Sequence, residues 1–526
     1  MVALSLGEPQ IVIIGSGAAG GTVAHELTRR GHRVVLLEAG KRIEPGDFHQ
    51  EDMPAYAQLS WLDPRVATGD WLAARVAPDR PAWVVKAVGG STLHWNGLAY
   101  RAQPHELRAR STYGAVAGSS LADWPLDHAE LLPWYGRAEA KLGVTGTHGI
   151  AAHPATAHYS LLHAGARRVG YRRISNARLA INSAARDDRP GCQQLGFCNQ
   201  GCMISAKWST LVSEIPKAEA TGRLDLRTES TVVRIEHGAD GRADAVVYAD
   251  ATGALHRQAA HVVVLAANSI ETARLLLLSD SNRFPRGLAN GSDQVGRNYM
   301  RHVTGLTYAV MPGPVNMHRG IVTPGTVFDE ARHDPARGFA GGYLMEAAGL
   351  SPLSVALLLD PAGWGADYAG FIARYDHLAG MLMNGEELPS ADNRVTLDDK
   401  VKDARGLPVA RVHVVEHAHT RAMRAHFFER SAALYRSLGA TDIRHGQPAS
   451  ATHNMGTARM GDDPATSVVD RFGRAHEVPN LWIVDGSIMP TSTAENPTLT
   501  IVALALRASH RLAGRHLSGS AATTKA

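Results

Sequence analysis

Runs of consecutive apolar residues mark the strands that this chain predicts near its two ends. Ile11–Ile14 and Arg33–Leu37 enclose a segment of helical pattern that continues to Arg30. Further strand patterns lie at Val262–Asn268 and at Val478–Ser487, the second of which ends in a turn. An apolar run of this length, bounded by turn residues, is typical of a buried strand. The pattern therefore predicts an α/β fold that begins with a strand-helix-strand unit.

The pattern changes between about residues 305 and 443. This stretch is rich in Gly and Pro and contains short strand patterns such as Asn393–Leu397, followed by a long helical pattern from Thr420 to Leu438. It predicts a second sheet with helices, so that the chain as a whole is α+β in content. No internal repeat or heptad array interrupts this organisation.

The length and composition indicate how many domains the chain forms and whether it binds nucleic acid or crosses a membrane. A length of 526 residues predicts either two substantial domains or one large α/β domain with insertions. The 54 basic and 50 acidic residues are interspersed, with a net charge of +4, so we expect no nucleic-acid partner. Apolar stretches are far shorter than the roughly 20 residues of a membrane helix, so no span is expected.

The first residues, Met1–Gln10, lack the basic and apolar regions of an export signal. This favours a cytoplasmic protein, or one that is exported together with a signal-bearing partner.

The turn after the first strand predicts a dinucleotide site. Gly15 permits the turn, Gly17 lets backbone approach a pyrophosphate, and Gly20 lets the helix pack on the strand. Glu38 follows the second strand, eighteen residues after Gly20, where an acceptor for ribose hydroxyls is expected. The predicted contacts in this region are Gly15, Gly17, Ala18, Ala19, Gly20, Glu38 and Ala39.

All three cysteines fall within eleven residues, at Cys192, Cys198 and Cys202. Thiolates are ligands of iron-sulfur clusters and zinc, so the crowding favours a metal site. Zinc is the weaker interpretation because structural zinc uses four protein ligands. Free thiols in a loop, or a disulfide with one cysteine left over, are the alternatives.

A second glycine-rich stretch, Val88–Gly97, resembles the second flavin-contacting loop of the glucose-methanol-choline (GMC) oxidoreductase family. The resemblance implies FAD as the dinucleotide, with further contacts from Gly89, Gly90, Thr92, His94, Trp95 and Asn96. His94 stands where some sugar oxidases of the family join a histidine covalently to the flavin. A packed, hydrogen-bonded histidine is the alternative.

Two more segments are similar to the family. Thr231–Ile235 resembles the strand in which a valine, here Val233, contacts adenine. Val262–Asn268 resembles the strand that enters the second family signature and implies a cofactor contact at Ala267. The chain departs from that signature at Asn268–Thr272, which places it in a divergent branch.

The C-terminal part contains a predicted catalytic pair, His453 and Asn496. The family places a histidine at the first position and a histidine or asparagine at the second. A neutral imidazole can remove the hydroxyl proton as hydride leaves the carbinol carbon, and an amide can orient the substrate oxygen. Further cofactor contacts are expected at Asp485, Gly486, Pro497 and Thr498.

The spacing of the cysteines resembles the ligand pattern of three-iron clusters in the catalytic subunits of bacterial FAD-dependent sugar dehydrogenases. This implies a 3Fe-4S cluster, a small partner subunit, and a cytochrome or quinone that accepts the electrons. Co-export with the small subunit to the periplasm would account for the absence of a signal. Gln193-Gln194 and Met203-Ile204 depart from the usual flanks of the motif.

These placements predict a discontinuous Rossmann-like FAD domain and a second domain of sheet and helices that binds the substrate. The expected FAD domain comprises residues 1–154, 192–304 and 447–526, and the substrate domain comprises 155–191 and 305–446. The predicted function is an FAD-dependent dehydrogenase of a sugar, glycoside or other alcohol. An oxidase that uses O₂, with structural cysteines, is the alternative, followed by a flavin-containing lyase or a non-catalytic flavoprotein.

Overall fold

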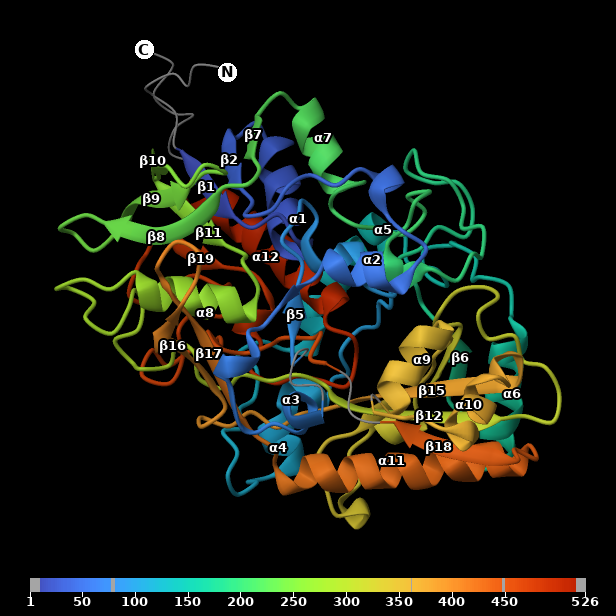
Figure 1. Cartoon of the computed structure of the whole chain (residues 1–526). Coiled ribbons are helices and arrows are strands. Elements are labelled where there is room, and N and C mark those ends of the chain that lie inside the picture. The colour runs from blue at the N-terminus through green and yellow to red at the C-terminus, as the bar shows by residue number, and fades with distance from the viewer. Residues whose placement is uncertain (1–9, 77–80, 361, 447–449, 517–526) are drawn as a thin grey trace.

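The computed structural model describes residues 10–76, 81–360, 362–446 and 450–516 (Figure 1). The segment before Gln10, on which the expectation about export depends, lies outside the described residues. Within the described part of the chain, no helix is both long and apolar enough to cross a membrane.

A five-stranded parallel sheet forms the centre of the upper half of the molecule (Figure 1). Its order is β19-β11-β1-β2-β7, and the strands are β1 (Ile11–Ile14), β2 (Val34–Leu37), β7 (Leu224–Arg227), β11 (Val262–Leu265) and β19 (Leu481–Ile483). Every residue of β1, β2, β11 and β19 is buried, as their apolar sequences require. The predicted α/β fold is confirmed.

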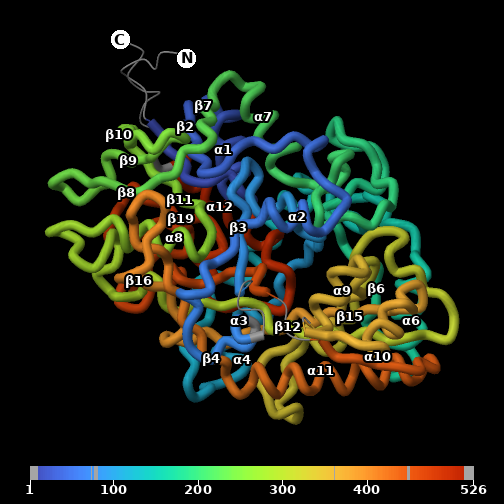
Figure 2. Tube along the Cα trace, in the orientation of Figure 1, coloured from blue at the N-terminus to red at the C-terminus, as the bar shows by residue number. Residues whose placement is uncertain are grey.

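Helices pack against this sheet and against one another. Helix α1 (Ala18–Thr28) contacts α7 (Glu214–Ala220) and the C-terminal helix α12 (Thr498–His516), which also contacts α5 (His128–Leu142). An antiparallel ribbon of β8 (Thr231–His237), β9 (Ala243–Ala249) and β10 (Leu255–Ala259) lies beside the sheet (Figure 2). Helix α8 (Ser269–Leu278) follows β11 in the sequence and packs on β8.

A six-stranded sheet forms the lower half of the molecule, in the order β18-β12-β15-β14-β13-β6. Its strands pair antiparallel and are β6 (Ile174–Asn176), β12 (Val303–Val310), β13 (Gly325–Val327), β14 (Tyr343–Ala347), β15 (Leu378–Gly385) and β18 (Asp442–Gly446). The long helix α11 (Ala418–Ser437) runs along one face of this sheet (Figures 1 and 2).

Smaller sheets and shorter helices complete the described structure. A third sheet joins β16 (Arg394–Lys402), β17 (Pro408–Val415) and β4 (Ala67–Asp70), and it packs on α8 rather than on the six-stranded sheet. The short strands β3 (Ser60–Trp61) and β5 (Trp83–Val84) pair with each other. The remaining helices are α2 (Asp52–Ala57), α3 (Leu72–Val76), α4 (Ala109–Tyr113), α6 (Ala157–Arg168), α9 (Pro352–Leu359) and α10 (Ala366–Ile372).

Candidate active site

A cavity of about 690 Å³ has walls from both large sheets. The ends of β1, β2 and β11 contribute Ile14, Leu37 and Ala266, and the six-stranded sheet contributes Leu306 and Leu382. Ligands of α/β folds bind at the carboxyl ends of parallel strands, and three such ends meet in this cavity. The position is therefore that of a ligand site.

Two glycine turns approach each other closely at one end of the cavity. A Cβ atom on Gly90 would lie 2.9 Å from the Cα of Gly17, and Gly90 has a φ of +55°. Gly15 has a φ of +92°, and a Cβ there would lie 2.5 Å from the carbonyl oxygen of Ala266. Only glycine fits at these positions, and the absence of side chains leaves backbone open to a ligand.

The end of β2 is tied to the first glycine turn through Glu38. Its carboxylate accepts hydrogen bonds from the backbone N–H and hydroxyl of Ser16, at 3.0 and 2.6 Å, and from the N–H of Gly40 at 3.0 Å. Burial raises the pKa of Glu38, and these donors oppose the rise. Glu38 thus shapes the turn as well as lining the cavity.

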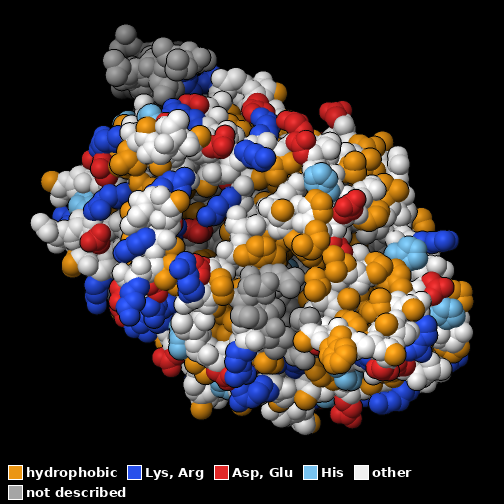
Figure 3. Space-filling model, viewed as in Figure 1, with side chains coloured by type: hydrophobic (Ala, Val, Ile, Leu, Met, Phe, Trp, Pro, Cys, Tyr) orange, Lys and Arg blue, Asp and Glu red, His pale blue; other side chains and the backbone are white. Residues whose placement is uncertain are grey.

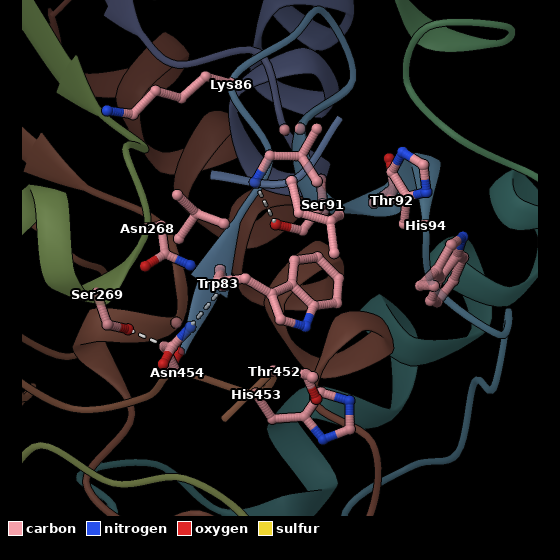
Figure 4. A pocket seen from close by; sticks show the side chains of 18 of the residues that line it. Trp83, Lys86, Ser91, Thr92, His94, Asn268, Ser269, Thr452, His453 and Asn454 are labelled. Carbon is pink, nitrogen blue, oxygen red and sulfur yellow. Dashed lines mark hydrogen bonds between the residues drawn. The ribbon is translucent and has the colours of Figure 1, made fainter. Parts of the chain in front are cut away.

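Most of the predicted contacts line this one cavity, although they come from four separate segments. They are Gly15, Gly17, Ala18, Ala19, Glu38, Ala39, Gly90, Thr92, His94, Trp95, Asn96, Ala267, His453, Asp485, Gly486, Asn496, Pro497 and Thr498. Figure 4 shows His94 and His453 in the same space, together with the indole ring of Trp83. The structure therefore brings together groups that the sequence placed up to several hundred residues apart.

Four expected contacts differ in detail. The wall contains Val232 in place of Val233, because successive strand residues point to opposite faces. Gly20 lies behind the wall, where a Cβ would meet the carbonyl oxygen of Gly15 at 1.9 Å, as its predicted packing role requires. Gly89 immediately precedes the lining residue Gly90 and has a φ of +103°.

Asp485 lines the cavity, but its carboxylate already accepts hydrogen bonds from the start of α8. Its Oδ2 accepts from the hydroxyl of Thr272 and from the backbone N–H of Asn268.

His453 is fixed by a second histidine that the sequence analysis did not identify. The Nδ1 atoms of His453 and His302 lie 2.8 Å apart, with the two rings at 85°. Nε2 of His302 lies 3.0 Å from the carbonyl oxygen of Thr493. Burial lowers the pKa of His302 to about 4 and that of His453 well below its ordinary value, so both rings are neutral near pH 7.

These contacts define the proton positions on both rings. A carbonyl oxygen can only accept, so the single proton of His302 is on Nε2 and its Nδ1 is an acceptor. His453 must then donate through Nδ1–H, which leaves the lone pair on its Nε2. His453 lines the cavity, and no described residue hydrogen-bonds to this Nε2. The arrangement provides a proton acceptor that faces the cavity.

Asn496 lies beside the start of helix α12. Its Oδ1 is buried without a hydrogen-bond partner in the described chain, and Pro497 and Thr498 follow it in the cavity wall. The first turn of α12 contains no acidic residue, and the free N–H groups at a helix start carry partial positive charge. The helix start can therefore stabilise negative charge that develops on a substrate oxygen.

A buried carboxylate in the wall was also missed. Glu346 on β14 is 1% exposed, and its Oε1 accepts from the Nδ2 of Asn384 on β15 at 2.9 Å. Asn496 lies close enough to stabilise the carboxylate, but Oε2 has no hydrogen bond within the described chain. Burial raises the pKa of Glu346 to about 7. The signal in the sequence was a charged residue within an otherwise apolar strand.

His94 presents one free ring nitrogen. Its Nδ1–H donates to the carbonyl oxygen of Asn199 at 2.9 Å, whereas Nε2 is buried with no partner among the described residues. Burial lowers the pKa of His94 to about 4, so the imidazole is neutral. A neutral ring with an unprotonated Nε2 can act as a nucleophile or accept a hydrogen bond.

The three cysteines share one apolar cluster but do not form a ligand set. All are free, and Cys192 and Cys202 accept backbone N–H groups through Sγ at 3.3 and 3.4 Å. Burial raises the pKa of Cys192 to about 11 and that of Cys198 in the same direction. Among the described residues no three His, Cys, Asp or Glu side chains are placed to hold a metal ion, so the arrangement does not support the expected cluster.

Lys207 connects the cysteine loop to the loop that carries His94. Its buried Nζ donates to the carbonyl oxygens of Leu93, Trp95 and Cys198 at 2.9, 2.7 and 2.5 Å. Burial lowers the pKa of Lys207 to about 8. The two loops are therefore in direct contact through one cation.

Comparison with known proteins decides the family. Residues 10–304 and 389–505 match two family models, both described as GMC oxidoreductase, and the first spans more than half of the chain. The chain belongs to the GMC oxidoreductase family. This confirms the resemblance that the sequence motifs indicated.

Relatives align over almost their full lengths. The chain is 31% identical to 2-methyl-1,2-propanediol dehydrogenase of Mycolicibacterium austroafricanum, over 97% of this chain and 96% of that protein. It is also 31% identical to the fructose dehydrogenase large subunit of Gluconobacter japonicus, over 95% and 96%. The solved structure of pyridoxine 4-oxidase from Mesorbium loti shares the fold, with a TM-score of 0.67 at 19% identity, over 97% of this chain and all of that one.

This GMC oxidoreductase is therefore an FAD-dependent oxidoreductase that acts on CH–OH donors. The cavity fits FAD on its own evidence. Glycine turns expose backbone where phosphates would lie, and cavity residues carry buried polar atoms without partners, namely Nε2 of His94, Oδ1 of Asn96 and Oδ1 of Asn496.

Proposed function

We propose that the protein is an FAD-dependent dehydrogenase that oxidises a CH–OH group and passes the electrons to an external acceptor through an iron-sulfur cluster in the cysteine loop. The observation that carries the first part is the unprotonated Nε2 of His453, a residue that lines the same cavity as Asn496. A base in this state can remove the hydroxyl proton while hydride leaves the same carbon.

Each protein group has a defined task in this reaction. His453 takes the hydroxyl proton on Nε2, and His302 keeps its Nδ1 proton in place. Asn496 orients the substrate oxygen, and the start of α12 stabilises negative charge that develops there. FAD, when bound, supplies the acceptor for the hydride. Fixed positions of these groups lower the entropic cost of reaching the reactive geometry.

The cysteine loop supports the second part of the proposal less directly. Three free cysteines lie within eleven residues and pack in one apolar cluster, and backbone N–H groups point at two of the sulfurs. Such N–H groups are a feature of protein sites for iron-sulfur clusters. Lys207 places this loop against the cavity. Ligation would require the three thiolates to converge from their present positions.

The test is anaerobic purification followed by iron and sulfide analysis and by mixing with alcohols and sugars. We expect about three irons per flavin, and bleaching of the flavin by at least one CH–OH substrate. Cys198→Ser should abolish the iron and leave the bleaching intact. Flavin that no alcohol or sugar reduces would contradict the oxidation chemistry, and bleaching without iron would contradict the cluster alone.

An oxidase that transfers the electrons to O₂ is the second candidate. The observation that favours it is that the described structure does not arrange the three thiols as a ligand set. In that case aerobic turnover would produce about one H₂O₂ per substrate, and Cys198→Ser would leave the rate unchanged.

A covalent link between His94 and FAD is a further proposal. The free Nε2 of His94 lies in the cavity wall and can bond to the ring methyl group of the flavin. Bond formation would release one proton and leave two electrons on the flavin, which an external oxidant must remove. We expect acid-precipitated enzyme to keep its yellow colour and His94→Ala to release it. Release of the flavin from the unmodified enzyme would contradict the link.

A further inference from the structure

The six-stranded sheet presents alternate side chains to the cavity. Thr304 and Leu306 on β12 and Leu382 and Asn384 on β15 belong to the cavity wall, whereas Met381 and Met383 belong to the core on which α11 packs. The register pairs Thr304 with Asn384 and Leu306 with Leu382. On the neighbouring strand β14, Glu346 pairs with Leu382. The cavity-facing side of the sheet therefore consists of the polar pair Thr304 and Asn384, followed by a row in which two leucines lie beside Glu346.

The polar pair lies at the catalytic end. Thr304 follows two residues after His302, which contacts His453, and Asn384 donates to Glu346. The leucine row, Leu306 and Leu382, is two residues away from Thr304 and Asn384 on their respective strands, a distance of roughly 7 Å. Glu346 belongs to this second row, but its carboxylate contacts Asn384 and lies near Asn496, so the two leucines form the apolar part of the row.

Further apolar side chains line the cavity beyond the leucine row. Ala348 and Leu350 continue from β14, and Leu357 and Leu358 of α9 lie against the same space. Hydrophobic side chains also gather on the surface over α9 (Figure 3). The described wall in this region therefore consists largely of aliphatic carbon.

The polar groups in this region are already engaged. The hydroxyls of Tyr56 and Ser354 lie 2.8 Å apart, and Ser354 also donates to Asp52 at 3.3 Å. By contrast, Oε2 of Glu346 at the catalytic end is buried without a partner in the described chain. This acceptor lies beside Asn384 and close to Asn496, a member of the proposed catalytic pair.

We propose that the substrate is an amphiphilic alcohol. Its apolar body lies against Leu306 and Leu382 of the sheet and the leucines of α9. Beside the reacting carbinol it carries a second hydrogen-bond donor, which binds Glu346. A vicinal hydroxyl group is the simplest such donor. A free hexose fits poorly, because several of its hydroxyls would lie against leucines without partners, and such burial is costly. This inference rests on the proposed function, since it assigns the substrate class of the same site.

The test measures flavin reduction of the holoenzyme under anaerobic conditions with matched compounds. These are 1,2-diols of three to eight carbons, 1-alkanols of equal length, D-glucose and D-fructose. The apparent dissociation constant should fall about two- to four-fold per added methylene, because each is buried against aliphatic carbon. A 1,2-diol should bind at least about five-fold more tightly than the 1-alkanol of the same length, because it donates to Glu346.

Variants separate the two parts of the proposal. Glu346→Gln should remove most of the preference for diols, and Leu382→Asn should flatten the dependence on chain length. Leu358→Asn on α9 tests the same wall if the strand variant fails to fold. Leu255→Asn, on the exposed strand β10, is the matched control and should change neither.

The outcomes distinguish this inference from the proposed function. Hexoses that bind as tightly as hexane-1,2-diol, or no dependence on chain length, would overturn the inference while the oxidation chemistry stands. Failure of every alcohol and sugar to reduce the flavin would overturn both.

Discussion

Replacing His453 with alanine should lower the rate constant of flavin reduction by at least about 10²-fold. The reason is that Nε2 of His453 is held without a proton at the cavity wall, whereas His94, the other imidazole among the described lining residues, comes from a different loop. Stopped-flow mixing with a saturating alcohol under anaerobic conditions measures this rate. The flavin content should stay unchanged, because the glycine turns and β2 remain intact.

The pH profile provides a second readout of the same assignment. Burial and the neighbouring His302 hold the pKa of His453 well below its ordinary value. A base of this kind is active when deprotonated, so the reduction rate should be level from neutral to alkaline pH and fall only well below pH 6.5. His256→Ala, at an exposed position on β10, is the matched control. An unchanged rate in His453→Ala would rule out this residue as the base.

Replacing His302 with leucine should lower the same rate constant on the order of 10²-fold, although His302 is a positioning residue. Its Nδ1 accepts the proton of His453 and thereby keeps the lone pair on the reactive Nε2. In serine proteases, loss of the group that fixes the histidine tautomer costs about 10⁴-fold. We expect a smaller effect, because a water molecule that enters the vacated space can accept the same proton.

The conservative variant distinguishes this role from mere packing. Glutamine at position 302 offers an oxygen that can accept from His453 and an amide that can donate to the carbonyl of Thr493. His302→Gln should therefore recover most of the rate that His302→Leu loses, with the apparent substrate dissociation constant within about three-fold of the unmodified enzyme. Equal losses in both variants, with equal melting temperatures, would argue against control of the tautomer.

Local sequence patterns determined the parts of the site that depend on backbone shape. The turn from Gly15 to Gly20 and the loop at Gly89 and Gly90 were predictable, because positive φ values and close backbone approach require glycine. The strands β1, β2 and β11 were predictable because a strand buried on both faces needs a continuous apolar run. His453 and Asn496 were identified through the similarity of their flanks to one family.

Contacts between segments with no motif of their own were decided only by the tertiary structure. His302 is one of 26 histidines and precedes an ordinary strand, yet pairing of β12 in the second sheet brings it to His453. Glu346 and Asn384 meet because β14 and β15 are neighbours, and strand register is a long-range property. The cysteine spacing indicated shared ligation, but the positions of the three thiols depend on how the loop packs against Leu98 and Ile181. Sequence thus determined the chemistry near each turn, and pairing between distant strands determined which side chains meet.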